Sequence, residues 1–259
     1  MRYTHLVPVE GEEVIALDWY VPEEPKGART AVFIHGFGSE RRGDKAVHFA
    51  ERFEALGWHY LALDLRGHGD SSGGMEGLTL SRSLADLTAA LDWLPPGQAP
   101  PVLIGSSMGG AVAAWHRALH PARSGAIALI APAFSFPHDF SKTLSAAEVA
   151  EWRKTGRHRF RNEWLDVVIG YDLIADAASY DPARLVREFA APTLILHGME
   201  DEAVDWRASL KFVEDCPCAT LELVLFKDGD HRLTDRKELL FDTIAAWLRG
   251  LSGMEAGRG

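Results

Sequence analysis

The sequence predicts an α/β protein with a mostly parallel eight-stranded sheet and helices on both of its faces. Short continuous apolar runs, such as residues 31–34 and 193–196, recur along the chain, as strands that are covered on both faces require. Segments of helical character separate these runs. Strand–helix alternation repeated this often is typical of a doubly wound α/β domain.

The first predicted strands, residues 4–9 and 14–21, flank Glu10-Gly11-Glu12 and form an antiparallel hairpin at one edge of the sheet. Six further strands are predicted at residues 30–35, 58–64, 102–105, 126–131, 193–197 and 221–226. The predicted helices are residues 44–56, 79–94, 107–119, 205–214 and 234–248. Thr79 or Ser81 caps the second of these helices, and Pro95 and Pro96 end it.

The stretch between Pro132 and Pro192 contains no strand of the parallel kind. Within it, residues 145–155 and 171–178 read as helices and residues 157–169 as a basic, β-rich piece. Ser145 and Glu148 have the spacing of a capping box. A connection this long is usually a lid or an inserted subdomain. We therefore expect one discontinuous core of residues 1–132 and 192–250, a cap at 133–191 and a flexible tail at 251–259.

The composition argues against several classes of partner. The chain has 259 residues and a formal net charge of −10, so it repels nucleic-acid phosphates and anionic lipids. It contains no apolar run long enough to span a bilayer, and residues 1–10 lack the apolar region of a signal peptide. Cys216 and Cys218 are too close together for an unstrained disulfide and read as reduced thiols. We expect a cytoplasmic monomer or homodimer.

The clearest motif is Gly105-Ser106-Ser107-Met108-Gly109, between an apolar run and an alanine-rich helix. A serine on such a sharp strand-to-helix turn holds its hydroxyl clear of the backbone, and the glycines leave room for the turn. The register selects Ser107, because Ser106 would require a glycine at Ile104. In the alternative interpretation, Ser107 is only the N-cap of the helix that follows.

A serine nucleophile requires a base, and the base requires an orienting acid. His231 follows the last predicted strand, so it lies at the edge of the sheet where Ser107 emerges. The acid is expected after the preceding strand, because triads whose serine lies on such a strand-to-helix turn occur in the chain order Ser, Asp, His. That loop offers Glu200, Asp201 and Glu202; we choose Asp201, with Glu200 as the second candidate.

The other candidate site residues are chosen by their position relative to the predicted strands and cap. The backbone N–H of Phe37, after the first parallel strand, is predicted to pair with that of Met108 as donors to a developing oxyanion. His35 is interpreted as a structural brace for this loop. Phe134, Trp152 and Trp206 are the candidates for the apolar, acyl-binding side.

The cap also carries a basic run that includes Arg157, Arg159 and Arg161. This run either forms a solvated surface or attracts anionic substrates, and both interpretations stay open. The spacing of histidines and cysteines predicts no metal site, and we expect no organic cofactor.

Several motifs follow the predicted strands: His35-Gly36-Phe37-Gly38, Asp64-Leu65-Arg66-Gly67-His68-Gly69-Asp70-Ser71, Gly105-Ser106-Ser107-Met108-Gly109-Gly110, His197-Gly198-Met199-Glu200-Asp201 and Gly229-Asp230-His231. Together they resemble the α/β-hydrolase superfamily over about residues 30 to 248. The chain also resembles a narrower branch, which contains the mitochondrial acyl-protein thioesterase also described as an acyl-glucuronide esterase. The resemblance implies the α/β-hydrolase fold and assigns nucleophile, acid and base to Ser107, Asp201 and His231.

We therefore predict a serine hydrolase that cleaves carboxylic esters or thioesters of small to medium acyl chains through an acyl-enzyme. A serine aminopeptidase and a carbon–carbon bond hydrolase stay open as alternatives. A dehalogenase would carry Asp in place of Ser107, and a binding module would usually lack one triad member. Nucleotide binding is not expected, because Asp44 stands where a phosphate-binding loop requires lysine.

Overall fold

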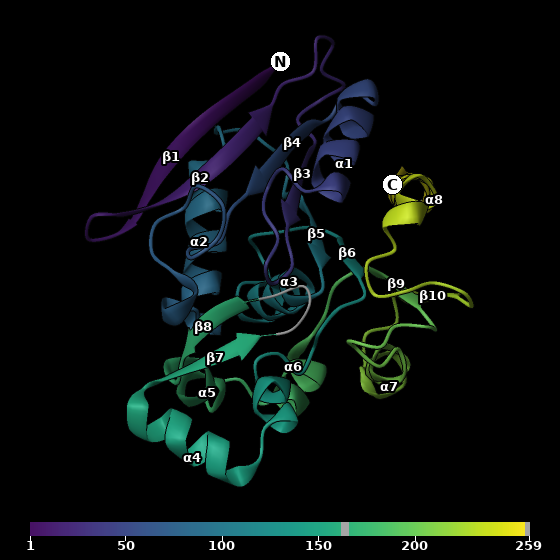
Figure 1. Cartoon of the computed structure of the whole chain (residues 1–259). Helices are drawn as coiled ribbons and strands as arrows, with labels where there is room; N and C mark the ends of the chain where they lie inside the picture. Colours follow the sequence, from purple (N-terminus) through teal and green to yellow (C-terminus); the bar gives the residue numbers. More distant parts are fainter. Residues whose placement is uncertain (162–165, 257–259) are drawn as a thin grey trace.

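The computed structural model describes residues 1–161 and 166–256. Its large sheet has eight strands in the order β1-β2-β4-β3-β5-β6-β9-β10 (Figure 1). The strands are β1 (Arg2–Glu10), β2 (Glu13–Tyr20), β3 (Thr30–Ile34), β4 (His59–Leu63), β5 (Val102–Ser106), β6 (Ile127–Ile130), β9 (Thr193–Gly198) and β10 (Leu221–Phe226). Pairing is antiparallel from β1 to β2 and from β2 to β4, and parallel between all the other neighbours. The predicted fold class is confirmed.

Helices cover both faces of this sheet (Figure 1). They are α1 (Asp44–Ala55) and α8 (Lys237–Ala256) on one face, and α2 (Leu80–Trp93), α3 (Met108–Leu119) and α7 (Arg207–Asp215) on the other. Alternate residues of β5 pack against the helices on the two faces of the sheet, because successive side chains of a strand point to opposite faces. Leu103 packs in the layer of α2 and α3, and Ile104 packs in the layer of α1 and α8. Within the described residues, no helix has the length and apolar character of a membrane span.

The antiparallel hairpin forms one edge of the sheet, as predicted. Its register runs from Arg2 opposite Tyr20 to Glu10 opposite Glu13, with a β-bulge between Pro8 and Glu10. Val7 is the one buried residue of β1, so this strand covers the core only lightly. The strands β3, β5, β6 and β9 lie further inside the sheet, and β10 forms its other edge.

Residues between β6 and β9 form a separate group of elements, which we call the inserted segment (Figure 1). It contains the 3₁₀ helix η2 (His138–Thr143), α4 (Ala146–Thr155), the antiparallel pair β7 (Arg157–Arg161) and β8 (Asp166–Gly170), α5 (Asp172–Ala177) and α6 (Pro182–Glu188). The capping box of Ser145 and Glu148 is confirmed. Helix α6 was not predicted, although Asp181 caps it and Pro182 occupies its first turn. The exact division into core and cap stays a prediction.

The end of the chain corrects one prediction. Helix α8 continues to Ala256, whereas the sequence predicted a helix end at residue 248 and a flexible tail at 251–259. Gly250 and Gly253 weaken a helix by about 1 kcal/mol each relative to alanine, but neither blocks it as a proline would. Residues 257–259 lie outside the described part of the chain.

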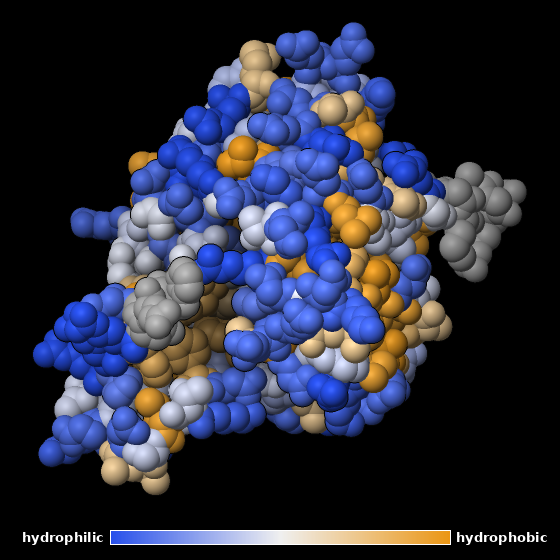
Figure 2. All heavy atoms as spheres, turned by 45° about the vertical axis from the view of Figure 1, so that its right-hand side comes forward, coloured by the Kyte–Doolittle hydropathy of each residue, from blue (hydrophilic) through white to orange (hydrophobic). Residues whose placement is uncertain are grey.

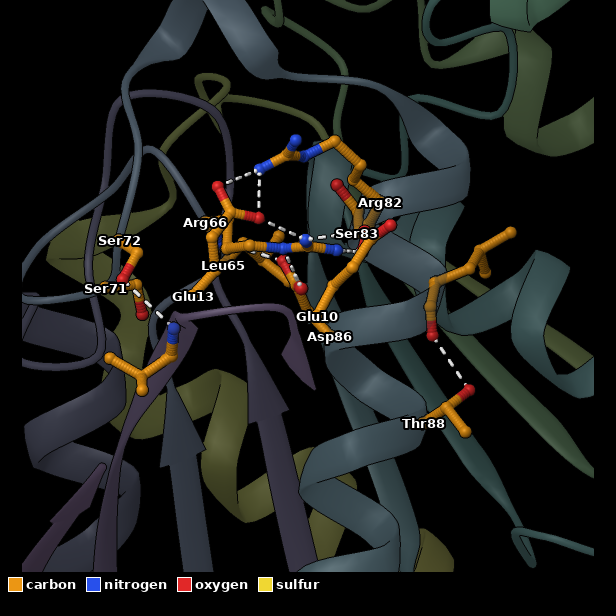
Figure 3. Close-up of polar contacts among 12 residues, drawn as sticks. Glu10, Glu13, Leu65, Arg66, Ser71, Ser72, Arg82, Ser83, Asp86 and Thr88 are labelled. Atoms are coloured by element: carbon orange, nitrogen blue, oxygen red, sulfur yellow. Dashed lines mark hydrogen bonds and ion pairs between the residues drawn. The ribbon is translucent and has the colours of Figure 1, made fainter. Parts of the chain in front are cut away.

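A buried arginine in the loop after β4 joins the hairpin to helix α2 (Figure 3). Arg66, 3% exposed, follows β4 and places its Nε 2.6 Å from the Asp86 carboxylate on α2. Its Nη1 lies 2.7 Å from Glu13 at the start of β2, and Arg82 of α2 pairs with the same carboxylate. Burial raises the pKa of Asp86, so this carboxylate depends on the guanidinium beside it to stay ionised.

We expect Arg66→Met to lower the free energy of unfolding by about 3–5 kcal/mol, because it leaves the buried Asp86 carboxylate without its cation. Urea unfolding followed by circular dichroism measures this loss. Arg184→Met is the matched control: it removes an exposed ion pair with Glu188 on α6 and should cost less than about 0.5 kcal/mol. Equal losses in the two variants would show that the Arg66 contacts do not stabilise the fold.

Candidate active site

Ser107 lies at the turn between β5 and α3 with a backbone conformation of φ 53° and ψ −116°. Residues other than glycine adopt such angles only at a cost of about 1–3 kcal/mol, and the surroundings must hold them there. The Ser107 N–H donates to the carbonyl of Ile130 at 2.9 Å, and the Ser107 carbonyl accepts from the N–H of Ala133 at 3.1 Å. The end of β6 therefore clamps the turn from one side.

Two glycines allow α3 to start directly against the strands. A Cβ on Gly109 would collide with the carbonyl oxygens of Ile34 and His35 at the end of β3. A Cβ on Gly105 would collide with the carbonyl of Gly109 itself. The glycines thus leave room for the turn, as predicted from the sequence. The turn exposes the Ser107 hydroxyl at the carboxyl edge of the sheet.

Three side chains from three loops form one hydrogen-bonded line. Nε2 of His231, after β10, lies 3.0 Å from Oγ of Ser107. Nδ1 of His231 lies 2.7 Å from Oδ2 of Asp201, after β9. Because the carboxylate accepts the Nδ1 proton, Nε2 is free to accept the proton of the serine hydroxyl. The structure thus brings together the three residues predicted from the sequence, whereas Glu200, the second candidate acid, is exposed.

The Asp201 carboxylate is held by more than His231. Its Oδ1 accepts the backbone N–H groups of Ala203 at 2.9 Å and Val204 at 2.8 Å. Its Oδ2 accepts a second imidazole N–H, from His197 at 3.0 Å. Burial by itself raises the pKa of Asp201, but the hydrogen bonds from His197, His231 and Val204 outweigh it and hold the pKa well below its usual value. The Asp201 carboxylate therefore stays ionised and keeps a fixed orientation toward His231.

His197 is a functional candidate that the sequence reasoning missed. It is fully buried at the end of β9, and its Nε2 faces two acceptors, the Asp201 carboxylate and the Val204 carbonyl at 3.1 Å. Nε2 therefore carries a proton, and Nδ1 pairs with the Ser209 hydroxyl on α7 at 2.8 Å. Its place four residues before the chosen acid, as the last side chain of a buried strand, was the available signal.

The predicted oxyanion donors lie beside the nucleophile. Met108 is the first residue of α3, so its N–H has no acceptor within the helix. Phe37 lies in a turn closed by the Ser39 N–H and the Gly36 carbonyl at 3.1 Å. A Cβ on Gly36 would lie 3.2 Å from the Ser107 Cβ, so this turn passes directly along the nucleophile. That the two N–H groups bind an oxyanion stays a prediction.

Buried polar groups support the Phe37 loop from beneath. His35 Nδ1 pairs with the Gly36 carbonyl at 2.7 Å, and its Nε2 accepts the Leu65 N–H at 3.1 Å. Burial lowers the pKa of His35 to about 3, so the ring is neutral and suits the bracing role predicted for it.

Arg41, at the far end of the same loop, is also buried. Its guanidinium pairs with Asp64, with Asp70 at 2.6 Å and with Asp18 at 3.3 Å. This cluster of charges was not predicted from the sequence.

Two cavities meet at Ser107 and His231. The larger, here called the apolar cavity, measures about 550 Å³; besides these two residues its wall includes Phe37, Met108, Phe136, Phe140, Phe160 and Val204. The smaller, here called the polar cavity, measures about 320 Å³; its wall includes Ser39, Glu40, Asp44, Lys45, Arg232 and Thr234. Figure 2 shows apolar atoms lining a recess between the inserted segment, at the lower left, and the main body.

The structure corrects the residues predicted for the acyl-binding side. Trp152 is fully buried within the inserted segment, where its Nε1–H donates to the Ile169 carbonyl at 3.0 Å. Phe134 is buried against Phe212 of α7, with ring centroids 4.1 Å apart. Trp206 is half-buried beneath the Arg207 guanidinium, and none of the three lines either cavity. The aromatic residues that line the apolar cavity include instead Phe140 of η2 and Phe160 of β7.

The basic run of the inserted segment is largely a solvated surface. Arg159 is exposed and forms two 2.6 Å hydrogen bonds with Asp166 across the β7–β8 pair. Arg161 alone of the three predicted arginines lines the apolar cavity. Among the residues that the structure describes, no group of three or more His, Cys, Asp or Glu is placed to hold a metal ion.

Comparison with known proteins identifies a family and several relatives of this chain. The sequence profile of the alpha/beta hydrolase family matches residues 31–243. The mitochondrial palmitoyl-protein thioesterase ABHD10 of Mus musculus is 28% identical over 216 residues, which cover 80% of this chain and 70% of the relative. A monoacylglycerol lipase of Mycolicibacterium smegmatis is 25% identical over 267 residues, covering 93% of this chain and 94% of the relative.

Two solved structures superpose closely on this chain. A putative hydrolase from Agrobacterium vitis superposes with a TM-score of 0.83 at 28% identity, covering 95% of this chain and 98% of the other. The mouse alpha/beta hydrolase domain-containing protein 10 superposes with a TM-score of 0.82 at 25% identity, covering 96% and 99%.

The contacts of His197 predict a difference between two substitutions. His197→Gln retains an N–H donor near the position of Nε2, whereas His197→Asn is too short to reach Asp201. We expect the Asn variant to react about 10-fold more slowly at Ser107 with a fluorophosphonate, because a hydrogen bond to a charged group contributes about 1.5–3 kcal/mol. The rate of covalent labelling, followed by intact-protein mass spectrometry, measures the effect.

The Gln variant should label within about 3-fold of the wild type, since its amide replaces the lost donor. Thermal unfolding of both variants separates this effect from loss of fold. Equal rates for the Asn and Gln variants, with both proteins folded, would rule out a positioning role for His197.

Proposed function

The chain belongs to the alpha/beta hydrolase family, and we propose that within it the protein hydrolyses carboxylic esters and thioesters through an acyl-enzyme on Ser107. The observation that carries the proposal is the alignment of Ser107 Oγ, His231 and Asp201: the 3.0 Å contact suits proton transfer from Ser107 to His231, and the 2.7 Å contact suits orientation of His231 by Asp201. Membership of the family confirms the resemblance drawn from the sequence motifs.

In the acylation step, His231 Nε2 takes the proton from Ser107 as Oγ attacks the substrate carbonyl carbon. The N–H groups of Phe37 and Met108 would stabilise the negative charge on the former carbonyl oxygen. Asp201 keeps the ring of His231 in place and stabilises its positive charge. The bond to the leaving alcohol or thiol then breaks, and His231 returns the proton to that leaving group.

In the deacylation step, water replaces the leaving group. His231 takes a proton from water, and the hydroxide oxygen attacks the acyl carbon bound to Ser107. The bond between Oγ and the acyl carbon breaks, Ser107 regains its proton from His231, and a carboxylic acid is released. No step needs a metal ion or an organic cofactor.

The substrate class is supported by the relatives and by the cavity. The relatives include proteins named as a palmitoyl-protein thioesterase and a monoacylglycerol lipase, which cleave thioesters and esters respectively. An apolar cavity of about 550 Å³ suits small to medium acyl chains. We also propose a cytoplasmic location, because Cys216 and Cys218 are free thiols, as in a reducing compartment; the mitochondrial location is that of the ABHD10 relatives.

We expect Ser107→Ala to reduce the turnover rate of p-nitrophenyl butyrate by a factor on the order of 10⁴ or more, because the attacking oxygen is lost. Steady-state release of p-nitrophenol measures the loss. A panel of alkyl esters, acyl thioesters and aminoacyl amides, run with the wild type, tests the bond that is cleaved. Turnover retained by the folded alanine variant, or cleavage of the amides alone, would overturn the proposal.

The choice of acid is tested separately. Asp201→Asn should reduce kcat for p-nitrophenyl butyrate by about 10²–10⁴-fold, because an amide no longer orients and stabilises the protonated His231. Glu200→Gln, the control in the same loop, should change kcat less than about 3-fold, because that carboxylate is exposed and outside the hydrogen-bonded line. A larger loss at Glu200 than at Asp201 would show that the acid is misassigned.

A further inference from the structure

The apolar cavity and the polar cavity share one wall. The residues common to both are Phe37, Gly38, Ser107, His231 and Arg232. The nucleophile and the base therefore face two separate spaces. A substrate whose carbonyl carbon lies at Ser107 carries two substituents, the acyl chain and the leaving group, and these must extend in different directions.

Outside the shared wall, the two spaces differ in chemistry. Rings of the inserted segment line the apolar cavity: Phe140 lies with its ring centroid 5.1 Å from that of Phe37 and 5.0 Å from that of Phe160. These rings form a continuous aromatic surface, which favours an acyl chain.

The polar cavity lies between the loop after β3, the start of α1 and the His231 loop. Lys45 of α1 donates from Nζ to the Arg232 carbonyl at 2.6 Å and so joins α1 to the loop of the base. An ammonium group has three donors, so two remain after this contact. Ser39, Asp44 and Thr234 add further polar side chains to the wall. A group that forms hydrogen bonds fits this space better than a hydrocarbon chain does.

The order of the chemical steps distinguishes the two spaces further. Deacylation is acylation run backwards with water in place of the alcohol, so water must reach His231 from the side on which the leaving group departed. An acyl chain that fills the apolar cavity excludes water from it. The polar cavity also contacts both Ser107 and His231, and it stays open to water when the apolar cavity is filled.

We propose that the apolar cavity binds the acyl chain and that the polar cavity is the subsite of the leaving group. The inference rests on the proposed ester or thioester hydrolysis and narrows its substrates. The enzyme is selective for compounds that join an apolar acyl chain to an alcohol or thiol bearing hydroxyl or amide groups. Lys45 and its neighbours recognise that polar leaving group.

Two matched substitutions test the assignment, each placing a bulky ring in one cavity. Ser39→Trp affects the polar cavity and Thr143→Trp the apolar cavity; both positions are exposed hydroxyl residues and neither belongs to the hydrogen-bonded line of Ser107. The acyl chain is varied with p-nitrophenyl acetate and octanoate. The leaving group is varied with methyl butyrate and glyceryl butyrate. The measured quantities are the two ratios of kcat/KM, octanoate over acetate and glyceryl over methyl.

We expect Ser39→Trp to lower the glyceryl-to-methyl ratio about 10-fold and to change the octanoate-to-acetate ratio less than about 2-fold, because steric exclusion acts on one substituent only. Thr143→Trp should show the opposite pattern. The reverse assignment of effects, or ratios unchanged in both variants, would overturn the inference while the proposed hydrolysis stands. A wild type that cleaves none of the four esters would overturn both.

Discussion

The site depends on the tight packing of β3, β5 and the start of α3 around Gly105 and Gly109. Any side chain at these positions would push the helix away from the carbonyl groups that end β3. The unfavourable backbone angles of Ser107 persist only because strands and helix are locked at this distance. The same contact sets the distance from the nucleophile to the loop of Phe37. A small change in packing there would therefore shift the Ser107 hydroxyl and the predicted oxyanion donors together.

The second constraint is electrostatic. Asp201 is a buried anion without a lysine or arginine among the partners described for it; four N–H groups surround it instead. Neutral donors stabilise the negative charge without cancelling it, so the carboxylate still acts on His231. Arg41 shows the converse arrangement. Its buried guanidinium is surrounded by carboxylates and anchors the loop that begins at His35. The loops that these two groups hold follow β9 and β3, which lie on opposite sides of β5, the strand before Ser107.

The sequence predicted the parts of the molecule in which local pattern and position agree. Buried strands of a parallel sheet read as apolar runs, and the loops at their carboxyl ends meet at one edge. The glycine motif around Ser107 and the order of these loops therefore led to Ser107, Asp201 and His231, with Glu200 as a second acid. Their roles stay predictions. The inserted segment was harder, because its short elements pack by tertiary contact. Aromatic side chains suit a core as well as a cavity, and Trp152, a candidate for the acyl-binding side, is part of the core. His197 was overlooked because a buried strand residue reads as core, and its contacts with Asp201 and with Ser209 of α7 form only in the folded chain.

The antiparallel hairpin has a consequence for the behaviour of the protein in a crowded solution. Strand β1 is nine residues long and lies at the edge of the sheet, with Tyr3 and Leu6 exposed. Such an edge can recruit a strand from another chain. Pro8 lacks an N–H and the bulge beside it bends the ladder, so one end of β1 is a poor template for a new strand. The remaining end carries Arg2 and His5, whose polar side chains discourage aggregation through this edge.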